Sequence, residues 1–437
     1  NVDGRFILNG MRVGGPYKVE ISFVGYGKNI IDDIILSLGE TYVLNVKMQE
    51  EMIELKEFVV SAEKTRFTTE RTGATTNISN QQMNSMPTIT RSVQDIARLS
   101  PFANGMSFAG SDGRSTNFTV DGANFNNNFG LSSNLPGGGN PISLDAIEEV
   151  QVVVAPFDVR QTNFIGGGIN AITKSGTNEF KGTAYTYYKN QEMRGNRIDE
   201  IDFGIRNIES TKTYGISLGG PIIKNKLFFF VNGEYELKPG QVVNWRPSED
   251  GVANTDLMLS RTSKSDMEKV KQHLLTNYGY DPGSYTDYPA DESNKKLMAR
   301  IDWNINNSNK LSLRYNFTKN QAWYQTNGNS TDAGYRLSGL NRISQYSMAF
   351  SNSIYSQENT VNSLALDLNS RFSNKVSNQF LTTYTKIKDM RGSNSSPFPF
   401  IDIMYGVNPD GSQIVEPYIS AGYELFTWNN GVHNNIF

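Results

Sequence analysis

Residues that could bind a metal or a phosphate group are few in this sequence. It contains two histidines, His273 and His433, both in loop-like sequence and far apart, and it contains no cysteine. A zinc or haem site needs several such ligands held close together, so we expect no metal site. The glycine clusters at 137–139 and 166–168 lack the Gly-Lys-Ser/Thr that completes a phosphate-binding loop. We therefore expect no cofactor.

Paired carboxylates would offer a different chemistry, general acid and base catalysis. The adjacent residues Glu148 and Glu149 are the candidates. They begin an apolar strand, so their side chains point to opposite faces and cannot act together on one substrate. We expect both to lie on a solvated surface. The sequence thus indicates a protein that is not an enzyme and has no catalytic residues.

One short segment has the chemistry of a partner-binding strand. It lies in the polar connector 51–72 and consists of Glu57, Phe58, Val59, Val60, Ser61 and Ala62. An extended apolar hexapeptide can add as an edge strand to the sheet of a partner protein. Each backbone hydrogen bond contributes only about 0.5–1.5 kcal/mol net, so such pairing would be reversible. The alternatives are a last strand of the preceding domain or plain linker.

The composition allows several domains and a membrane location. Among 437 residues, 41 basic ones nearly balance 44 acidic ones, so nucleic acid is not indicated as a partner. Aromatic residues make up 11% of the chain, yet no apolar run approaches the ~18 residues of a membrane helix. A membrane protein of this composition would have to cross with β-strands. The chain opens in mid-pattern, and we expect both ends to be truncated.

The first 178 residues divide into three parts. Residues 1–50 predict short strands of a β-sandwich, at 4–10, 15–26 and 41–50. After the connector, residues 73–178 have a compact mixed α and β pattern. In it, 90–101 fits a short helix, and 115–127 predicts a strand, a turn at Asp121-Gly122 and a return strand. An acidic start, a buried β-run, a glycine cluster and a second apolar strand follow at 147–178.

From about residue 180 the chain alternates apolar and polar residues in paired runs. Strands joined by short turns are predicted at 211–219 and 227–237, at 297–305 and 310–319, and at 358–370 and 376–388. Long polar excursions separate the pairs, at 238–296 and 320–357, and the first contains a predicted helix at 265–285. Short turns at one end and long loops at the other are typical of outer-membrane β-barrels.

The alternation also predicts which side chains face the interior. Glu234, Arg300, Asp302 and Asp367 would point into a polar lumen, and the leucines and aromatic residues between them would meet lipid. A slip of one residue would put Arg300 in hydrocarbon, at a cost of about 2–4 kcal/mol near the midplane. This penalty determines the register more strongly than β-propensity does.

In this order the parts resemble the Oar-like group of TonB-dependent outer-membrane receptors, a type found in Bacteroidota. The most specific likeness lies in the segments 155–185 and 218–230. The resemblance implies a mainly β fold with four parts: a carboxypeptidase-regulatory-like β-sandwich at 1–50, a linker at 51–72, an α+β plug domain at 73–178 and the N-terminal part of a transmembrane antiparallel β-barrel at 179–437. Such barrels have about 22 strands in full, of which this chain would supply about seven.

The resemblance also implies roles for individual residues. Residues 57–62 match the TonB box, the strand that the periplasmic C-terminal domain of TonB captures, with Phe58 in place of a more usual valine. Structural positions of the plug are matched by Val120, Asp121, Gly122, Gly166, Gly167, Gly168, Asn170 and Lys174. In the family the glycines allow tight turns and close approach of the backbone inside the barrel.

Ligand-gated, energy-coupled import through a plugged barrel is the function that the resemblance implies. Peptides, proteins or other large molecules are the implied cargo. The implied location is the cell outer membrane, with plug and sandwich on the periplasmic side. TonB and outer-membrane lipids are the implied partners, and a surface lipoprotein or another outer-membrane protein is a candidate partner. The alternatives are a plugged-barrel scaffold subunit of an outer-membrane assembly or secretion complex and, more distantly, a soluble β-rich adhesin.

Overall fold

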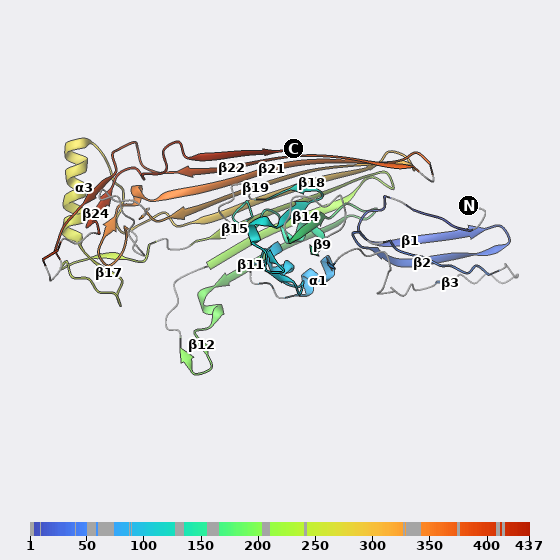
Figure 1. Cartoon of the computed structure of the whole chain (residues 1–437), viewed down its shortest axis with the longest axis horizontal. Helices are drawn as coiled ribbons and strands as arrows, with labels where there is room; N and C mark the ends of the chain where they lie inside the picture. The colour runs from blue at the N-terminus through green and yellow to red at the C-terminus, as the bar shows by residue number, and fades with distance from the viewer. Residues whose placement is uncertain are drawn as a thin grey trace.

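The computed structural model is mainly β and consists of an N-terminal sheet, an inner domain and a long sheet of antiparallel strands (Figure 1). The structure describes residues 4–8, 10–39, 41–49, 58–59, 74–86, 88, 90–126, 135–154, 166–202, 210–239, 243–326, 328, 342–373, 376–407, 411–412 and 416–437. Within these residues, no helix combines the length and the apolarity that a membrane-spanning helix requires.

The N-terminal sheet is a hairpin with one short added strand. β1 (Gly14–Phe23) pairs antiparallel with β2 (Tyr26–Leu36), and β3 (Phe58–Val59) pairs parallel with β2. The strand predicted at 15–26 is confirmed as β1. The strands predicted at 4–10 and 41–50 are wrong, because the described residues there join no ladder; Gly27 N–H donates to Gln49 C=O at 2.9 Å. β2 was not predicted, because three of its four buried residues are consecutive and the pattern does not alternate.

The inner domain runs from β4 to the end of β10 and contains a sheet in the order β4-β9-β10-β7-β8. Its strands are β4 (Ala74–Ser79), β7 (Asn117–Val120), β8 (Ala123–Asn124), β9 (Ile147–Val154) and β10 (Gly167–Thr173), with the short pair β5 (Ala103–Asn104) and β6 (Ser107–Phe108) beside them. Its helices are α1 (Asn80–Ser85) and α2 (Val93–Ala97), with 3-10 turns η1 (Gly113–Ser115) and η2 (Leu144–Ala146).

Local sequence explains these elements. The valines of β9 are buried because α2 packs against this strand and because β4 and β10 pair with its two edges. The Ser79 hydroxyl accepts from the Gln82 N–H, and the Gln82 side chain accepts from the Ser79 N–H, so a capping box starts α1. The helix predicted at 90–101 is confirmed in the shorter α2, and the strand, turn and return strand at 115–127 are confirmed in β7 and β8.

The long antiparallel sheet, which we call the wall, follows the chain order with β11 and β25 at its edges. As far as the chain is described it has eight strands: β11 (Lys181–Asn190), β14 (Ser210–Ile223), β15 (Leu227–Lys238), β18 (Glu292–Asn304), β19 (Asn309–Tyr324), β21 (Tyr355–Arg371), β22 (Ser377–Gly392) and β25 (Gly431–Ile436). Each of the predicted strands from 211 to 388 is confirmed. A further small hairpin, η3 (Gln191–Arg194), β12 (Arg197–Ile198) and β13 (Ile201–Asp202), follows β11.

The two faces of the wall differ as predicted. Leu297, Ile301 and Trp303 of β18 are 40–46% exposed on the outer face. Asp302 of the same strand is fully buried on the inner face, and Glu234 and Arg314 of neighbouring strands are almost fully buried there. An apolar outer face and a polar inner face are what a membrane β-barrel strand requires. The predicted register is confirmed.

The chain segments that follow β15, β19 and β22 fold together at the end of the wall opposite the N-terminal sheet; we call this part the cap (Figure 1). Its elements are β16 (Arg246–Ser248), β17 (Leu259–Ser263), α3 (Lys264–Tyr278), β20 (Met348–Ala349), η4 (Ser351–Ser353), β23 (Ile401–Ile403) and β24 (Ile419–Ala421). The helix predicted at 265–285 is α3, which is shorter because Gly279 takes a left-handed conformation and ends it.

Candidate functional site

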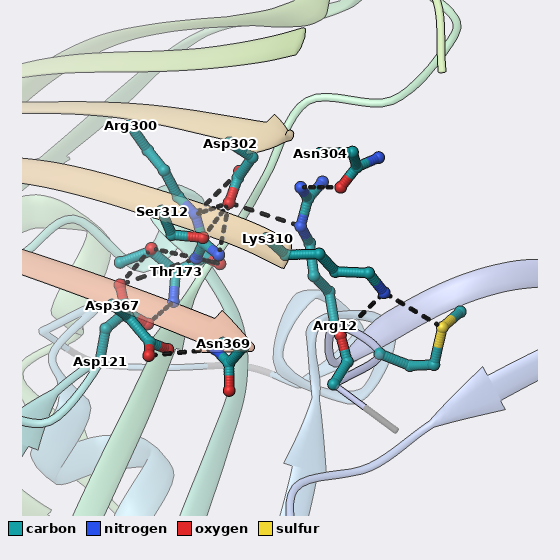
Figure 2. Close-up of polar contacts among 12 residues, drawn as sticks. Arg12, Asp121, Thr173, Arg300, Asp302, Asn304, Lys310, Ser312, Asp367 and Asn369 are labelled. Carbon is teal, nitrogen blue, oxygen red and sulfur yellow. Dashed lines mark hydrogen bonds and ion pairs between the residues drawn. The ribbon is translucent and has the colours of Figure 1, made fainter. Parts of the chain in front are cut away.

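The inner domain meets the inner face of the wall at a cluster of buried and partly buried charges, which we call the lock: Asp121, Arg300, Asp302 and Arg314. Figure 2 shows the first three of them. Asp121 belongs to the turn between β7 and β8. Its Oδ2 lies 3.0 Å from Arg314 Nη1 and 3.7 Å from Arg300 Nη1. Arg300 in turn contacts Asp302 at 3.0 Å. Two guanidiniums and two carboxylates therefore balance in a buried place.

Hydrogen bonds complete the geometry of the lock. Asp121 Oδ1 accepts from the Thr173 N–H at 2.9 Å, and Asp121 Oδ2 accepts from the Thr173 hydroxyl at 2.6 Å. Arg300 Nη1 donates to the Thr173 carbonyl at 2.9 Å, and Arg314 Nη1 donates to the Val120 carbonyl. The wall thus binds the ends of two inner-domain strands, β7 and β10, as well as the carboxylate between them.

The guanidiniums also set the ionisation of Asp121. Burial acts to raise the pKa of this carboxyl, but Arg314 and Arg300 together with the Thr173 hydrogen bonds lower the pKa below its ordinary value. A carboxyl whose pKa is lower in the folded protein stabilises it fully at neutral pH. That contribution is lost only as the pH falls through the lowered pKa.

A second buried ion pair lies on the inner face near β11. Lys296 Nζ contacts Glu234 Oε1 at 2.8 Å. Glu234 Oε2 accepts from the Ser143 hydroxyl of the inner domain at 2.8 Å and from the Tyr185 hydroxyl at 2.6 Å. Lys296 already neutralises Glu234 within the wall. Ser143 of the inner domain therefore adds a hydrogen bond here without burying a further charge.

A third contact is neutral. The segment 135–141 of the inner domain, which includes the glycine cluster 137–139, lies against the inner face of the wall. Gly137 N–H donates to Asn359 Oδ1 at 2.6 Å, and Asn294 Nδ2 donates to the Gly137 carbonyl at 2.9 Å. The Thr318 hydroxyl donates to the Pro141 carbonyl at 2.6 Å. Such bonds contribute about 0.5–1.5 kcal/mol each, so this contact can break and re-form.

The glycines singled out in the sequence lie inside the inner domain, at the start of β10. Gly166 has a φ of +94°, and a Cβ there would lie 2.5 Å from Ser111 Oγ. A Cβ at Gly167 would lie 2.9 Å from both Phe108 Cβ and the Val153 carbonyl oxygen, whereas Gly168 has more room. The chain can therefore enter β10 between its neighbours only with glycine at positions 166 and 167.

The other predicted inner-domain residues are spread along β7 and β10. Val120 is buried, and Gly122 has a φ of +83° beside Leu381 of β22. Asn170 accepts from the Thr119 hydroxyl at 2.7 Å, which links β10 to β7. Lys174 follows β10 and lies 3.5 Å from Asp145. Of the inner-domain residues singled out in the sequence, Val120 and Asp121 are the two that contact the wall within the lock.

Part of the predicted partner-binding strand lies outside the described residues, namely Glu57, Val60, Ser61 and Ala62. Phe58 and Val59 form β3, with Phe58 opposite Asn29 and Val59 opposite Ile30 of β2. In this arrangement the two residues are the last strand of the N-terminal sheet, which is one of the alternatives that the sequence left open. Their role as a TonB box stays a prediction.

Two features of the site were missed or misjudged in the sequence. Glu149, expected on a solvated surface, is 3% exposed, and its Oε1 accepts from the Leu38 N–H at 2.8 Å. The expectation is wrong because the segment that follows β2 lies against this residue. Arg314 was not singled out, although it lies directly opposite Arg300 in the β18–β19 pair. Like charges in that position repel unless an anion lies beside them, and this was a readable signal.

The cap has its own buried ion pair. The Arg342 side chain is 1% exposed, and its Nε and Nη2 contact Asp402 at 3.0 and 2.8 Å. The Ser420 hydroxyl donates to Asp402 Oδ1 at 2.6 Å, and the Arg342 guanidinium lies over the Phe400 ring. The segments that follow β19 and β22 are thereby joined, so the cap offers a preformed surface at this end of the wall.

Replacing Arg342 should loosen the cap alone. Arg342→Met leaves Asp402 buried without its cation, and we expect a loss of local stability of about 3–5 kcal/mol. Hydrogen exchange of the full-length protein should rise in residues 342–354 and 416–421 and stay unchanged in β9. Lys264→Met, which removes an exposed ion pair with Glu249, is the control and should have no effect. An equal rise in β9 would contradict a separately folded cap.

Comparisons with known proteins agree with this architecture. Residues 172–435 match the family model described as outer membrane beta barrel domain. The TonB-dependent transporter Oar of Myxococcus xanthus is 27% identical over 240 residues, which cover 52% of this chain and 21% of that protein. The outer membrane transporter YddB of Escherichia coli has 12% identity and a TM-score of 0.53, with 83% of this chain and 44% of that chain covered. The siderophore receptor PirA of Acinetobacter baumannii has 16% identity and a TM-score of 0.47, with 83% and 44% covered. The chain thus spans less than half the length of these relatives.

Proposed function

Because the chain belongs to the outer membrane beta barrel domain family, we propose that it forms the plug and the first part of the barrel of a TonB-dependent transporter. The protein lies in the outer membrane. In this proposal the inner domain, within residues 73–178, is the plug, and residues 179–437 supply barrel strands. Residues 1–50 are the periplasmic sandwich, and the linker 51–72 carries the TonB box at 57–62. The relatives named above are transporters or receptors, and we propose that this protein likewise has no enzymatic activity.

One observation supports this function above all. The inner face of the wall is polar and would line a pore, and a domain with a sheet of its own occupies it. That domain is held by the lock, by the Glu234 and Ser143 contact and by the neutral bonds of the segment 135–141. Wall residues such as Phe230 and Met298 also pack against its apolar core. These noncovalent contacts would close the pore at rest and still allow release.

The proposed cycle follows from this arrangement. A ligand binds at the outer end, between the cap and the inner domain. TonB then captures residues 57–62 by strand addition, and force on the linker displaces part of the inner domain. We propose a peptide, a protein or another large molecule as the ligand. The periplasmic C-terminal domain of TonB and outer-membrane lipids are proposed partners, and a surface lipoprotein is a candidate for a lid on the cap.

Deleting residues 57–62 from the full-length protein tests the proposal. Binding of the purified TonB C-terminal domain should fall at least about tenfold, because most of the strand's backbone bonds are lost. Energy-dependent uptake should be abolished, whereas ligand binding at the cell surface should persist. Deletion of residues 63–68 is the length-matched control and should leave TonB binding unchanged.

Two outcomes would count against transport. Uptake that survives deletion of residues 57–62 would contradict the proposed mechanism. A fixed stoichiometric complex with other outer-membrane proteins, together with no effect of the deletion, would favour the scaffold function instead.

A further inference from the structure

The segment before β1 is fastened to the rim of the wall (Figure 2). Arg12 Nε lies 3.4 Å from Asp302 Oδ1, and Arg12 Nη2 donates to Asn304 Oδ1 at 3.3 Å. Lys310 Nζ donates to the Gly10 carbonyl at 3.0 Å. Asn304 and Lys310 lie at the β18–β19 turn, so residues 10–12 sit where these two strands of the wall end.

The segment after β2 is fastened to the inner domain. Leu38 N–H donates to Glu149 Oε1 at 2.8 Å. The Leu38 carbonyl accepts from Gln151 Nε2 at 2.9 Å and from Asn77 Nδ2 at 3.1 Å. Both backbone groups of Leu38 are therefore bound by side chains of β9 and β4, which are neighbouring strands of the inner-domain sheet.

These two attachments belong to the same end of one hairpin. Gly14 lies opposite Leu36 in the β1–β2 ladder, so residues 10–14 and 36–39 form the base of the hairpin. The base also fits closely against the inner domain between the attachments. A Cβ at Gly14 would lie 2.6 Å from Glu148 Oε1, and burial raises the pKa of the Glu148 carboxyl. The base thus bridges the wall and the inner domain.

Asp302 connects this base to the lock. It contacts Arg12 at 3.4 Å and Arg300 at 3.0 Å, and its side chain is fully buried. If Arg12 leaves, Arg300 is the cation that remains in an ion pair with Asp302 among the described residues. Arg300 is also the more distant of the two guanidiniums on Asp121, at 3.7 Å. Loss of Arg12 would therefore draw Arg300 toward Asp302 and weaken its attraction to Asp121.

We propose that the base of the β1–β2 hairpin is a strap that holds the inner domain against the wall, so that the inner domain opens readily only after the strap leaves the rim. The proposal rests on the proposed function in one respect, that the inner domain is the part that moves. In the sequence, residues 57–62 lie between the strap and the inner domain. Tension on this segment would therefore act on both.

A disulfide can fix the strap to the wall. A Cβ at Gly10 would lie 3.8 Å from Asn369 Cβ, which is the usual Cβ separation in a disulfide. The chain has no cysteine, so Gly10→Cys combined with Asn369→Cys can form one bridge within this chain. Gly10 has a φ of +64°, so cysteine is strained there, but the strain is the same in the oxidised and reduced protein. The comparison is therefore made within one variant.

Hydrogen exchange of the full-length protein in detergent is the measurement. On oxidation of the double variant, exchange in β9 and β10 should slow by about tenfold, and reduction should restore it. Arg12→Met keeps an unbranched side chain but removes the guanidinium that pairs with Asp302 and lies over the Phe228 ring, and it should speed exchange in the same strands by a similar factor. Lys18→Met removes an exposed ion pair with Asp32 in the same sheet and should change nothing.

The results separate the strap from the proposed function. Failure of the bridge to form, or equal exchange in the oxidised and reduced protein, would overturn the strap. This readout needs neither TonB nor ligand. Failure of the TonB C-terminal domain to bind the unmodified protein would instead contradict the proposed function. The exchange data would still test the strap proposal independently.

Discussion

Asp121→Ala is expected to weaken the attachment of the inner domain to the wall by about 3–5 kcal/mol. The substitution removes the carboxylate that both Arg300 and Arg314 approach, at 3.7 and 3.0 Å. Arg314 is 2% exposed and would be left buried without a carboxylate partner. Burying an unpaired charge costs far more than the lost attraction of an exposed pair.

Hydrogen exchange in residues 117–124 and 167–173 should report this change, because Asp121 binds Thr173 at the end of β10. Glu179→Ala, which removes an exposed pair with Lys181, is the matched control and should leave exchange unchanged. Adding Arg314→Met to Asp121→Ala should recover part of the loss, since the uncompensated cation is removed as well. If the double variant were as unstable as the sum of the two single variants, the lock would not act as a charge-balanced unit.

Gly176→Ala is expected to prevent the wall and the inner domain from packing together. Gly176 lies in the segment between β10 and β11, where a Cβ would be 2.3 Å from the Phe229 carbonyl oxygen and 2.7 Å from the Gly220 carbonyl oxygen. Those atoms belong to the backbone of paired strands and cannot move aside easily. Overpacking usually costs about 1–3 kcal/mol, and with backbone on two sides we expect the upper end or more.

The amount of full-length protein that stays folded on unheated detergent gels would measure this effect. Gly233→Ala in β15 is the control, because the nearest atom to its added Cβ is Ile216 Cγ2 at 4.0 Å. The Gly233 variant should fold normally, whereas the Gly176 variant should be depleted. Equal recovery of both variants would show that the segment can shift away from the wall.

Much of the wall could be predicted from the sequence because, in each strand, the alternation of apolar and polar residues shows which side chains face outward and which face the interior. Alternation along 297–305 and 310–319 identified two strands and their faces, and Arg300 was assigned to the interior on that basis alone. Asp302, two residues further along the same strand, supplies the nearer counter-charge at 3.0 Å, and Asp121, nearly 180 residues earlier, supplies the second one at 3.7 Å. The position of Asp121 beside Arg300 depends on how the inner domain packs against the wall, and no local sequence pattern predicts that packing.

The N-terminal sheet was the least predictable part, for a related reason. The runs 4–10 and 41–50 have the composition of strands but form no strand ladder in the described residues, whereas β2 pairs with β1 although its pattern does not alternate. A strand depends on pairing as well as on propensity. The wrong expectation for Glu149 and the omission of Arg12 have the same cause. The surroundings of both residues depend on contacts between the segments that flank the β1–β2 hairpin and another part of the chain.

The burial of the lock has a consequence for the surroundings in which this protein works. Mobile ions weaken attractions between exposed charges over about 10 Å at 0.1 M, but they screen buried pairs much less. Asp302 and Arg314 are almost completely shielded from solvent. In the proposed function, changes in salinity outside the cell would therefore leave the closed pore intact, and its opening would depend on force applied to the linker rather than on the ionic strength of the medium.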